Sequence, residues 1–204
     1  QLERLPLLIR EDLLMKLELT WIGKNENINV EPRILIEDNK LSNIENDSNT
    51  DNMIIHGDNL LALKALESKY TGAIKCIYID PPYNTGSAFE YYDDNLEHSI
   101  WLSLMKPRLK ILSNLLSDDG VIFVQIDDNE QANLKKICDE IFGEENFVAQ
   151  LSTIMNLKGN NDEFGFSGTH EFTAVYSKEK VSLKLNNLTV DEEELNDWKE
   201  DELG

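Results

Sequence analysis

A short run of β-branched and aromatic residues that ends at two prolines constrains the fold of this chain most strongly. Residues 73–79 read AIKCIYI and lead directly into Asp80, Pro81, Pro82 and Tyr83. The run predicts a buried strand. The prolines must end that strand at Asp80, because proline lacks the N–H of a ladder and restricts the residue before it. Asp80 is therefore expected at the carboxyl end of a strand, where open α/β sheets bind their ligands.

The turn at Asp80 suits the methylation of an exocyclic amino group. Such a nitrogen is a weak nucleophile, because its lone pair is delocalised into the base ring. The Asp80 carboxylate and the Pro81 carbonyl would accept its two N–H bonds and draw the lone pair out of conjugation. Pro82 keeps the turn rigid, and Tyr83 offers a face on which an extruded base stacks. The same residues also fit an ordinary strand-ending turn with a capping aspartate, so the motif alone leaves both interpretations open.

The residues before the motif predict a βαβ unit. A short strand at 53–56 is followed by a turn at Gly57 and Asp58 and by an amphipathic helix at 59–68, and residues 73–79 then form the second strand. This pattern predicts an α/β fold.

Six ordered stretches of the chain resemble the modification subunit of type III restriction–modification systems, a beta-class DNA adenine-N6 methyltransferase. They are residues 19–24, 55–64, 76–86, 96–102, 126–130 and 138–143, and the similarity covers most of residues 17–178. The resemblance implies a Rossmann-like methyltransferase sheet that is circularly permuted and truncated. It implies S-adenosyl-L-methionine as the cofactor and methyl transfer to adenine N6 in DNA by base flipping.

The resemblance also implies partners and site residues. The partners are double-stranded DNA, a restriction subunit and a second modification subunit in a homodimer, and the location is cytoplasmic. Asp58, Asn59 and Asp80 are expected to contact the cofactor, although a helix N-cap alone also explains Asp58. Residues in or soon after the motif are expected to bind the flipped adenine; they are Tyr83, Asn84, Phe89 and Tyr92. The last two belong to a loop at 84–95 that we expect to close over the base, but a surface loop pinned by buried aromatic residues explains Tyr92 equally well.

Hydrophobic periodicity predicts the remaining elements. Short strands are expected at 19–23 and 33–36, a helix kinked by Pro107 at 97–116, a strand at 121–126, a helix at 130–142 and an antiparallel pair of strands at 147–154 and 171–176. Asp128 and Gln131 form a variant of the capping box for the second of these helices. His98 is expected on the surface or in a packing role rather than as a catalytic base. Cys76 and Cys138 are expected to be buried thiols in a reducing compartment.

The chain divides into four predicted regions. They are a helical and strand extension at 1–37, a flexible linker at 38–52, the catalytic half of a methyltransferase domain at 53–178, and an acidic segment at 179–204 that leads toward a target-recognition region.

Residues 164–169 look like a cofactor loop of the Phe-x-Gly-x-Gly type. We reject that interpretation because the segment lies between two predicted strands instead of opening a helix.

Charge separates this chain from an independent DNA-binding domain. Thirty-nine acidic against nineteen basic side chains give a net charge of −20, so the chain alone should repel a phosphate backbone. We therefore expect the basic surface elsewhere in a larger protein, and we expect the 204 residues alone, which begin at Gln1, to be inactive. No metal site, membrane segment or signal peptide is predicted. Two alternatives stay open, namely an incomplete enzyme that acts only as an interaction module, and an amino-group methyltransferase for RNA or a protein amide.

Overall fold

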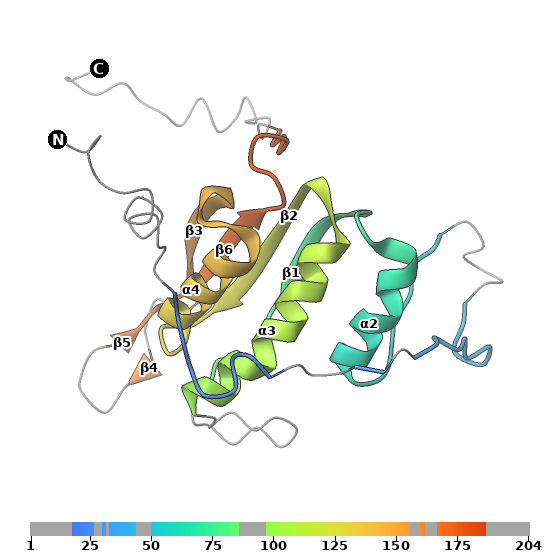
Figure 1. Cartoon of the computed structure of the whole chain (residues 1–204), viewed down its shortest axis with the longest axis horizontal. Coiled ribbons are helices and arrows are strands. Elements are labelled where there is room, and N and C mark those ends of the chain that lie inside the picture. Colours follow the sequence, from blue (N-terminus) through green and yellow to red (C-terminus); the bar gives the residue numbers. More distant parts are fainter. Residues whose placement is uncertain are drawn as a thin grey trace, which may run out of the picture.

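The computed structural model describes residues 18–26, 30–31, 33–43, 50–85, 97–155, 160–161 and 167–186. Its helices are α2 (Asn59–Tyr70), α3 (His98–Leu115), α4 (Gln131–Phe142) and the 3-10 turn η2 (Glu144–Asn146). Its strands are β1 (Ile74–Ile79), β2 (Leu116–Ile126), β3 (Phe147–Ile154), β4 (Asn160–Asn161), β5 (Ser167–Gly168) and β6 (His170–Ser177) (Figure 1).

Four strands form a mixed sheet in the order β1-β2-β6-β3, while β4 and β5 form a separate two-stranded ribbon. β1 and β2 are parallel, and α3 crosses between them as a βαβ unit requires. β6 runs antiparallel to both β2 and β3. The predicted α/β class and the predicted antiparallel pair of strands are confirmed, and the circular permutation stays a prediction.

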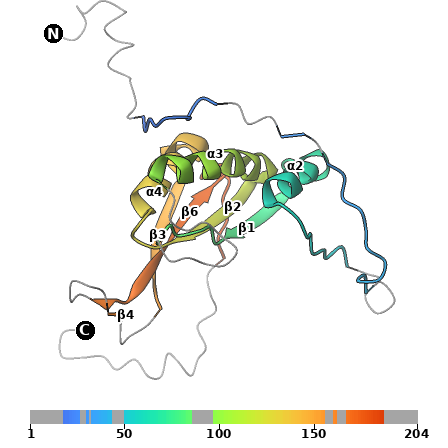
Figure 2. The ribbon, with the colours of Figure 1, turned by 90° about the horizontal axis from the view of Figure 1, so that it is seen from below.

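The helices α2, α3 and α4 cover one face of the sheet (Figure 2), and the core lies between them and the strands. Its largest fully buried side chains come from α3, α4, β2 and β6, and include Trp101, Met105, Leu109, Ile122, Ile126, Leu134, Ile137 and Tyr176. Burial of each apolar side chain of this size contributes about 1.5–3 kcal/mol. The core therefore fixes α3 and α4 against β2, and this packing sets the position of the carboxyl end of β1.

Three predicted strands are absent from the described residues. Residues 53–56 and 33–36 have no regular secondary structure, and residues 22–25 form a turn in place of the strand predicted at 19–23. An isolated strand is not stable without a ladder partner, and Ile54 accordingly stays fully exposed. The predicted βαβ unit before Asp80 is therefore wrong in its first strand, whereas its helix is confirmed as α2.

Two details of β1 and β2 also differ from the sequence prediction. β2 begins at Leu116 rather than at residue 121, because a register shift lets its first residues pair opposite the start of β1. Cys138 is buried as predicted, but Cys76 is exposed, because its side chain lies on the face of β1 that the helices leave open. In β1 only Ile77 is buried, so the prediction of a fully buried strand is wrong.

The predicted capping box at the start of α4 is wrong. The helix begins at Gln131, and its N-cap residue is Glu130, which makes no side-chain capping bond. Asp128 is exposed and does not cap the helix. Asp127 instead accepts a hydrogen bond from the Asn129 backbone N–H at 3.0 Å and so closes the turn before the helix. The Glu130 side chain instead contacts Asn84 and His98.

Candidate active site

Asp80 lies immediately after β1 and is exposed. Because β1 and β2 are parallel neighbours, the carboxyl end of β1 lies beside that of β2, where Asp127 follows Ile126. Burial raises the pKa of the Asp127 carboxyl, and the nearby Asp128 and Glu171 act in the same direction. The two strand ends thus place an exposed carboxylate and a half-buried one on the same edge of the sheet, the edge at which open α/β sheets bind ligands.

The Trp101 side chain of α3 fixes the proline turn. Its indole Nε1 donates a hydrogen bond to the Pro82 carbonyl at 2.8 Å, and its side chain is fully buried in α3. No described group donates a hydrogen bond to the Pro81 carbonyl. The bond from Trp101 therefore commits the Pro82 carbonyl to the core.

Tyr83 is half-buried, and its hydroxyl donates a hydrogen bond to Glu171 Oε2 on β6 at 2.9 Å. Gln125 Nε2 on β2 donates to the same oxygen at 2.5 Å, and the Tyr78 hydroxyl donates to Gln125 Oε1. Burial raises the pKa of Tyr83, and the carboxylates of Glu171 and Asp80 raise it further. The hydroxyl therefore stays protonated, and its bond to Glu171 sets the orientation of the ring.

Asn84 follows Tyr83 with a φ of 62°, in the left-handed region that asparagine tolerates better than most residues. Its side-chain Nδ2 donates a hydrogen bond to Glu130 Oε1 at 2.6 Å. His98 Nδ1, in the first turn of α3, lies 2.7 Å from the same oxygen. The hydrogen bond and the charge of Glu130 raise the pKa of His98. His98 is thus exposed, as predicted, but it forms an ion pair that the sequence did not indicate.

Asp58 and Asn59 lie at the start of α2 and are both exposed. Asp58 Oδ1 accepts a hydrogen bond from the Leu61 backbone N–H at 3.0 Å, so its N-cap role is confirmed. Asn59 Oδ1 accepts a hydrogen bond from Arg108 Nε on α3 at 2.8 Å. Burial lowers the pKa of Arg108, and the charge of Asp58 partly offsets that shift. These contacts fix the start of α2 against α3, and a cofactor role for Asp58 and Asn59 stays a prediction.

The predicted site is therefore only partly assembled by the described residues. Asp80, Pro81, Pro82, Tyr83 and Asn84 form one turn. Phe89 and Tyr92 lie outside the described residues, as does most of the predicted loop.

Sequence reasoning missed two carboxylates that bind the turn directly, Glu130 and Glu171, and Gln125, which binds Glu171. Glu130 lies within the stretch 126–130 that resembles the family, but nothing in its spacing indicates a contact with Asn84. A contact between residues far apart in the chain leaves no periodic signal in a single sequence.

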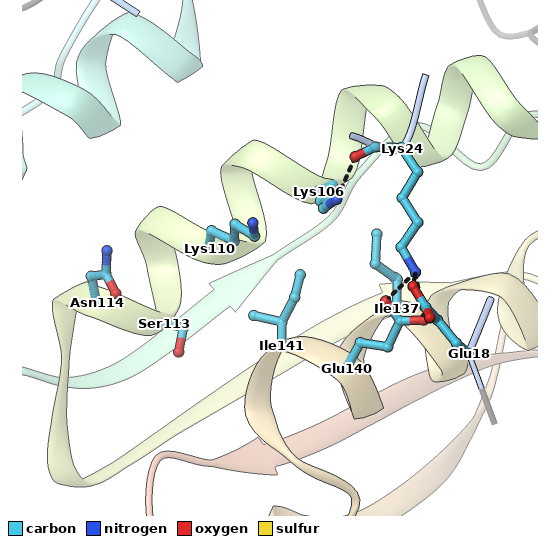
Figure 3. Close-up of a pocket in the computed structure, with 9 residues that line it drawn as sticks. All are labelled: Glu18, Lys24, Lys106, Lys110, Ser113, Asn114, Ile137, Glu140 and Ile141. Carbon is cyan, nitrogen blue, oxygen red and sulfur yellow. Dashed lines mark hydrogen bonds and ion pairs between the residues drawn. The ribbon is translucent and has the colours of Figure 1, made fainter. Parts of the chain in front are cut away.

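A groove of about 410 Å³ lies apart from this turn, between α3 and α4 (Figure 3). Lys24 spans one end of it, where its ammonium lies 2.6 Å from Glu18 and 2.9 Å from Glu140. Lys106 donates a hydrogen bond to the Lys24 carbonyl at 2.5 Å. These contacts hold residues 18–26 against α3 and α4. In the described chain, no cluster of three or more side chains has the arrangement of a metal site, and no described helix is long and apolar enough to cross a membrane.

The fold and the turn define an α/β domain that presents a carboxylate, a rigid carbonyl and an aromatic ring at the carboxyl edge of its sheet. The family model described as "DNA methylase" (N6_N4_Mtase) matches residues 74–203, and the chain belongs to this family.

The curated relatives agree with that assignment. The chain is 42% identical over 221 residues to the type III restriction-modification enzyme EcoPI Mod subunit of Escherichia phage P1, a match that covers 91% of this chain and 34% of that one. It is 47% identical over 139 residues to the probable type III restriction-modification enzyme HindVI Mod subunit of Haemophilus influenzae, covering 67% of this chain and 19% of that one. The resemblance to type III modification subunits is confirmed, and the chain spans about a third or less of the length of these two relatives.

A solved structure, that of the M1.HpyAVI-SAM complex, matches with a TM-score of 0.45 and 16% identity, and covers 67% of this chain and 60% of that one. The assignment rests on the family model and the relatives, not on this likeness.

Proposed function

We propose that this chain supplies the catalytic turn of a site-specific DNA methyltransferase that modifies adenine N6 within a type III restriction–modification system. The observation that carries the proposal is the exposed Asp80 at the end of β1 with its rigid Pro81–Pro82 turn. Membership of the DNA methylase family and the similarity to type III Mod subunits support it. These relatives favour DNA over RNA or a protein amide as the substrate, and an enzyme over an interaction module.

In this mechanism the turn prepares a weak nucleophile. The Asp80 carboxylate and the Pro81 carbonyl accept the two N–H bonds of an adenine N6 amino group, so its lone pair turns toward the methyl donor. Tyr83 stacks on the extruded base, with its ring oriented by the bond to Glu171. Alignment and a pre-oriented carboxylate supply most of the rate enhancement. The proton leaves the nitrogen to water after transfer, so the turn needs no strong base.

S-adenosyl-L-methionine would supply the methyl group as an electrophilic sulfonium. The donor set fits this cofactor, because Asp58 and Asp80 are exposed carboxylates that suit ribose hydroxyls and a cationic ligand. Asp58 uses one oxygen to cap α2. Asn59 uses its oxygen for Arg108, so its amide N–H groups are the atoms that would face the cofactor.

The proposed partners are double-stranded DNA, a restriction subunit and a second copy of the modification subunit, in the cytoplasm. With a net charge of −20, the chain would oppose rather than aid contacts to phosphates. We therefore expect the DNA-binding surface on other parts of the complete protein. Among the substrate residues, Tyr83, Asn84, Phe89 and Tyr92 remain proposals.

Substitution of Asp80 tests this function in the complete protein, by measuring incorporation of a radiolabelled methyl group into DNA. We expect Asp80→Ala to lower incorporation about 10²–10³-fold or more, because one of the two acceptors for the amine is lost. Thermal unfolding should change little, since Asp80 is exposed. The matched control is Asp118→Ala, an exposed aspartate near the opposite end of β2, which should retain full activity. Undiminished incorporation in Asp80→Ala, or a label found outside adenine, would contradict the proposal.

A further inference from the structure

A buried carboxylate joins the catalytic turn to the starts of two helices. Glu130, the N-cap residue of α4, is 0% exposed. Its Oε1 receives Asn84 Nδ2 at 2.6 Å and His98 Nδ1 at 2.7 Å, and its Oε2 receives Asn133 Nδ2 at 2.7 Å. The side chain leaves the start of its own helix uncapped. The Glu130 carboxylate therefore binds the turn, and it does not accept a hydrogen bond from the backbone N–H groups at the start of α4, as an N-cap side chain would.

The chemistry of this contact requires a hydrogen on His98 Nδ1, because the Glu130 carboxylate only accepts hydrogen bonds. A buried carboxylate is costly unless it is paired and hydrogen-bonded. No lysine or arginine of the described residues forms an ion pair with Glu130, whereas His98 does. The imidazolium form of His98 thus both donates the hydrogen bond and balances the buried charge.

The contact reaches the reacting groups through Asn84. This residue adopts a left-handed φ of 62° directly after Tyr83, a conformation that persists when its surroundings hold it. The bond from Asn84 to Glu130 supplies such support. Loss of the bond would let the backbone of the turn relax, with Tyr83 and the Asp80 carboxylate one and four residues away in sequence.

We propose that Glu130 is a positioning residue for methyl transfer, which holds the catalytic turn through Asn84 and is paired inside the protein with His98. The inference rests on the proposed function, since it assigns the support of the same turn. Glu130 itself touches no reacting atom.

A pH dependence follows from the pair. The pKa of His98 is raised above its ordinary 6.5, mainly by the hydrogen bond and the charge of Glu130. The charge of Glu97, the N-cap residue of α3, raises this pKa further, and partial burial opposes the shift. A raised histidine pKa means that the charged pair is complete below pH 6.5 and is lost as pH rises through the raised value. Support of the turn should therefore weaken on the alkaline side.

The first experiment compares Glu130→Gln with wild type in the complete protein. We expect kcat to fall about tenfold to hundredfold, while KM for DNA and KM for S-adenosylmethionine stay close to wild type. Glu144→Gln makes the same chemical change at an exposed position and should leave kcat unchanged. A wild-type kcat in Glu130→Gln would overturn the inference and leave the proposed function intact, whereas a wild-type protein that methylates no adenine would overturn the proposed function.

The second experiment uses His98→Gln, which keeps an N–H donor at an exposed position and so preserves the fold even if Glu130→Gln is unstable. Its kcat should lose the alkaline decline of the wild-type pH profile, and the control His170→Gln should keep it. Nitrogen-15 NMR of the labelled histidines gives a readout without activity, because the pKa of His98 should fall toward 6.5 in Glu130→Gln. An unchanged His98 titration in Glu130→Gln, or an unchanged pH profile in His98→Gln, would overturn the assignment of His98.

Discussion

At the scale of single residues, three hydrogen bonds from three different elements fix the turn after β1. Trp101 of α3 donates a hydrogen bond to the Pro82 carbonyl. Glu171 of β6 accepts one from the Tyr83 hydroxyl, and Glu130 accepts one from the Asn84 side-chain amide. Removal of one partner leaves a buried polar group unpaired, which costs about 1–3 kcal/mol, more than the net contribution of the bond. The turn is thus held by long-range polar contacts as well as by its prolines.

Trp101→Phe should therefore disturb the turn more than an ordinary core substitution. We expect it to destabilise the protein by about 1–3 kcal/mol in urea unfolding, because the Pro82 carbonyl loses its donor, and to lower kcat for methyl transfer. Trp21→Phe is the matched control, since it removes a 2.8 Å bond from Trp21 Nε1 to Ser103 Oγ away from the turn. The control should lose stability but retain kcat. Equal kcat values for Trp101→Phe and wild type would show that this bond does not support the turn.

At the scale of elements, the junction of α3 with β2 determines where the two parallel strands end. The chain passes from Leu115 of the helix to Leu116 of the strand without a loop. The first residues of β2 bulge opposite β1, where Ile74 pairs with Leu116 and Cys76 pairs with Val121. This bulge takes up the extra residues of β2, so the carboxyl ends of the two strands remain in register beside Asp80.

The bulge depends on the missing side chain of Gly120. A Cβ at this position would lie 2.8 Å from the backbone oxygens of Ile74 and Ser117, and neither oxygen is free to move without a change in the strand pairing. Gly120→Ala should therefore destabilise the protein by about 1–3 kcal/mol in urea unfolding. A stability equal to that of wild type would mean that the bulge relaxes without strain, and that Gly120 does not determine the register of β1 and β2.

At the scale of the whole molecule, two features distinguish the folded chain: one face of the sheet is not covered by helices, and the net charge is strongly negative. The helices cover one face of the sheet (Figure 2), while the Tyr78 side chain on the other face is 59% exposed. A net charge of −20 on 204 residues adds self-repulsion to the folded state.

Salt should therefore stabilise the 204-residue chain. We expect the midpoint of thermal unfolding to rise between 10 mM and 300 mM NaCl, because the Debye length falls from about 30 Å to less than about 8 Å over this range and repulsion between carboxylates is screened. An equal rise in KCl would identify screening rather than binding of a specific ion. A midpoint that falls with salt would show instead that ion pairs such as Lys24 with Glu140 outweigh the repulsion.

The sequence by itself determined the elements whose signals are local. The β-branched run ending at Asp80 and the apolar periodicity of α3 depend on neighbours within a few residues, and both were predicted correctly as a strand and a helix. The N-cap at Asp58, given as the alternative to a cofactor role, depends on neighbours in the same way. The end of β1 at Asp80 was predicted because prolines restrict the backbone directly. Its resemblance to a family then predicted the chemistry.

Only the tertiary structure decided what holds the motif. The contacts of Glu130 and Glu171 with the turn join residues 46 and 88 positions apart, and no pattern in a single sequence encodes such a pairing. The same reason explains the error at residues 53–56, which have the composition of a strand but lack a partner among the described residues. A hydrogen bond needs two groups, and folding alone brings the second one within reach.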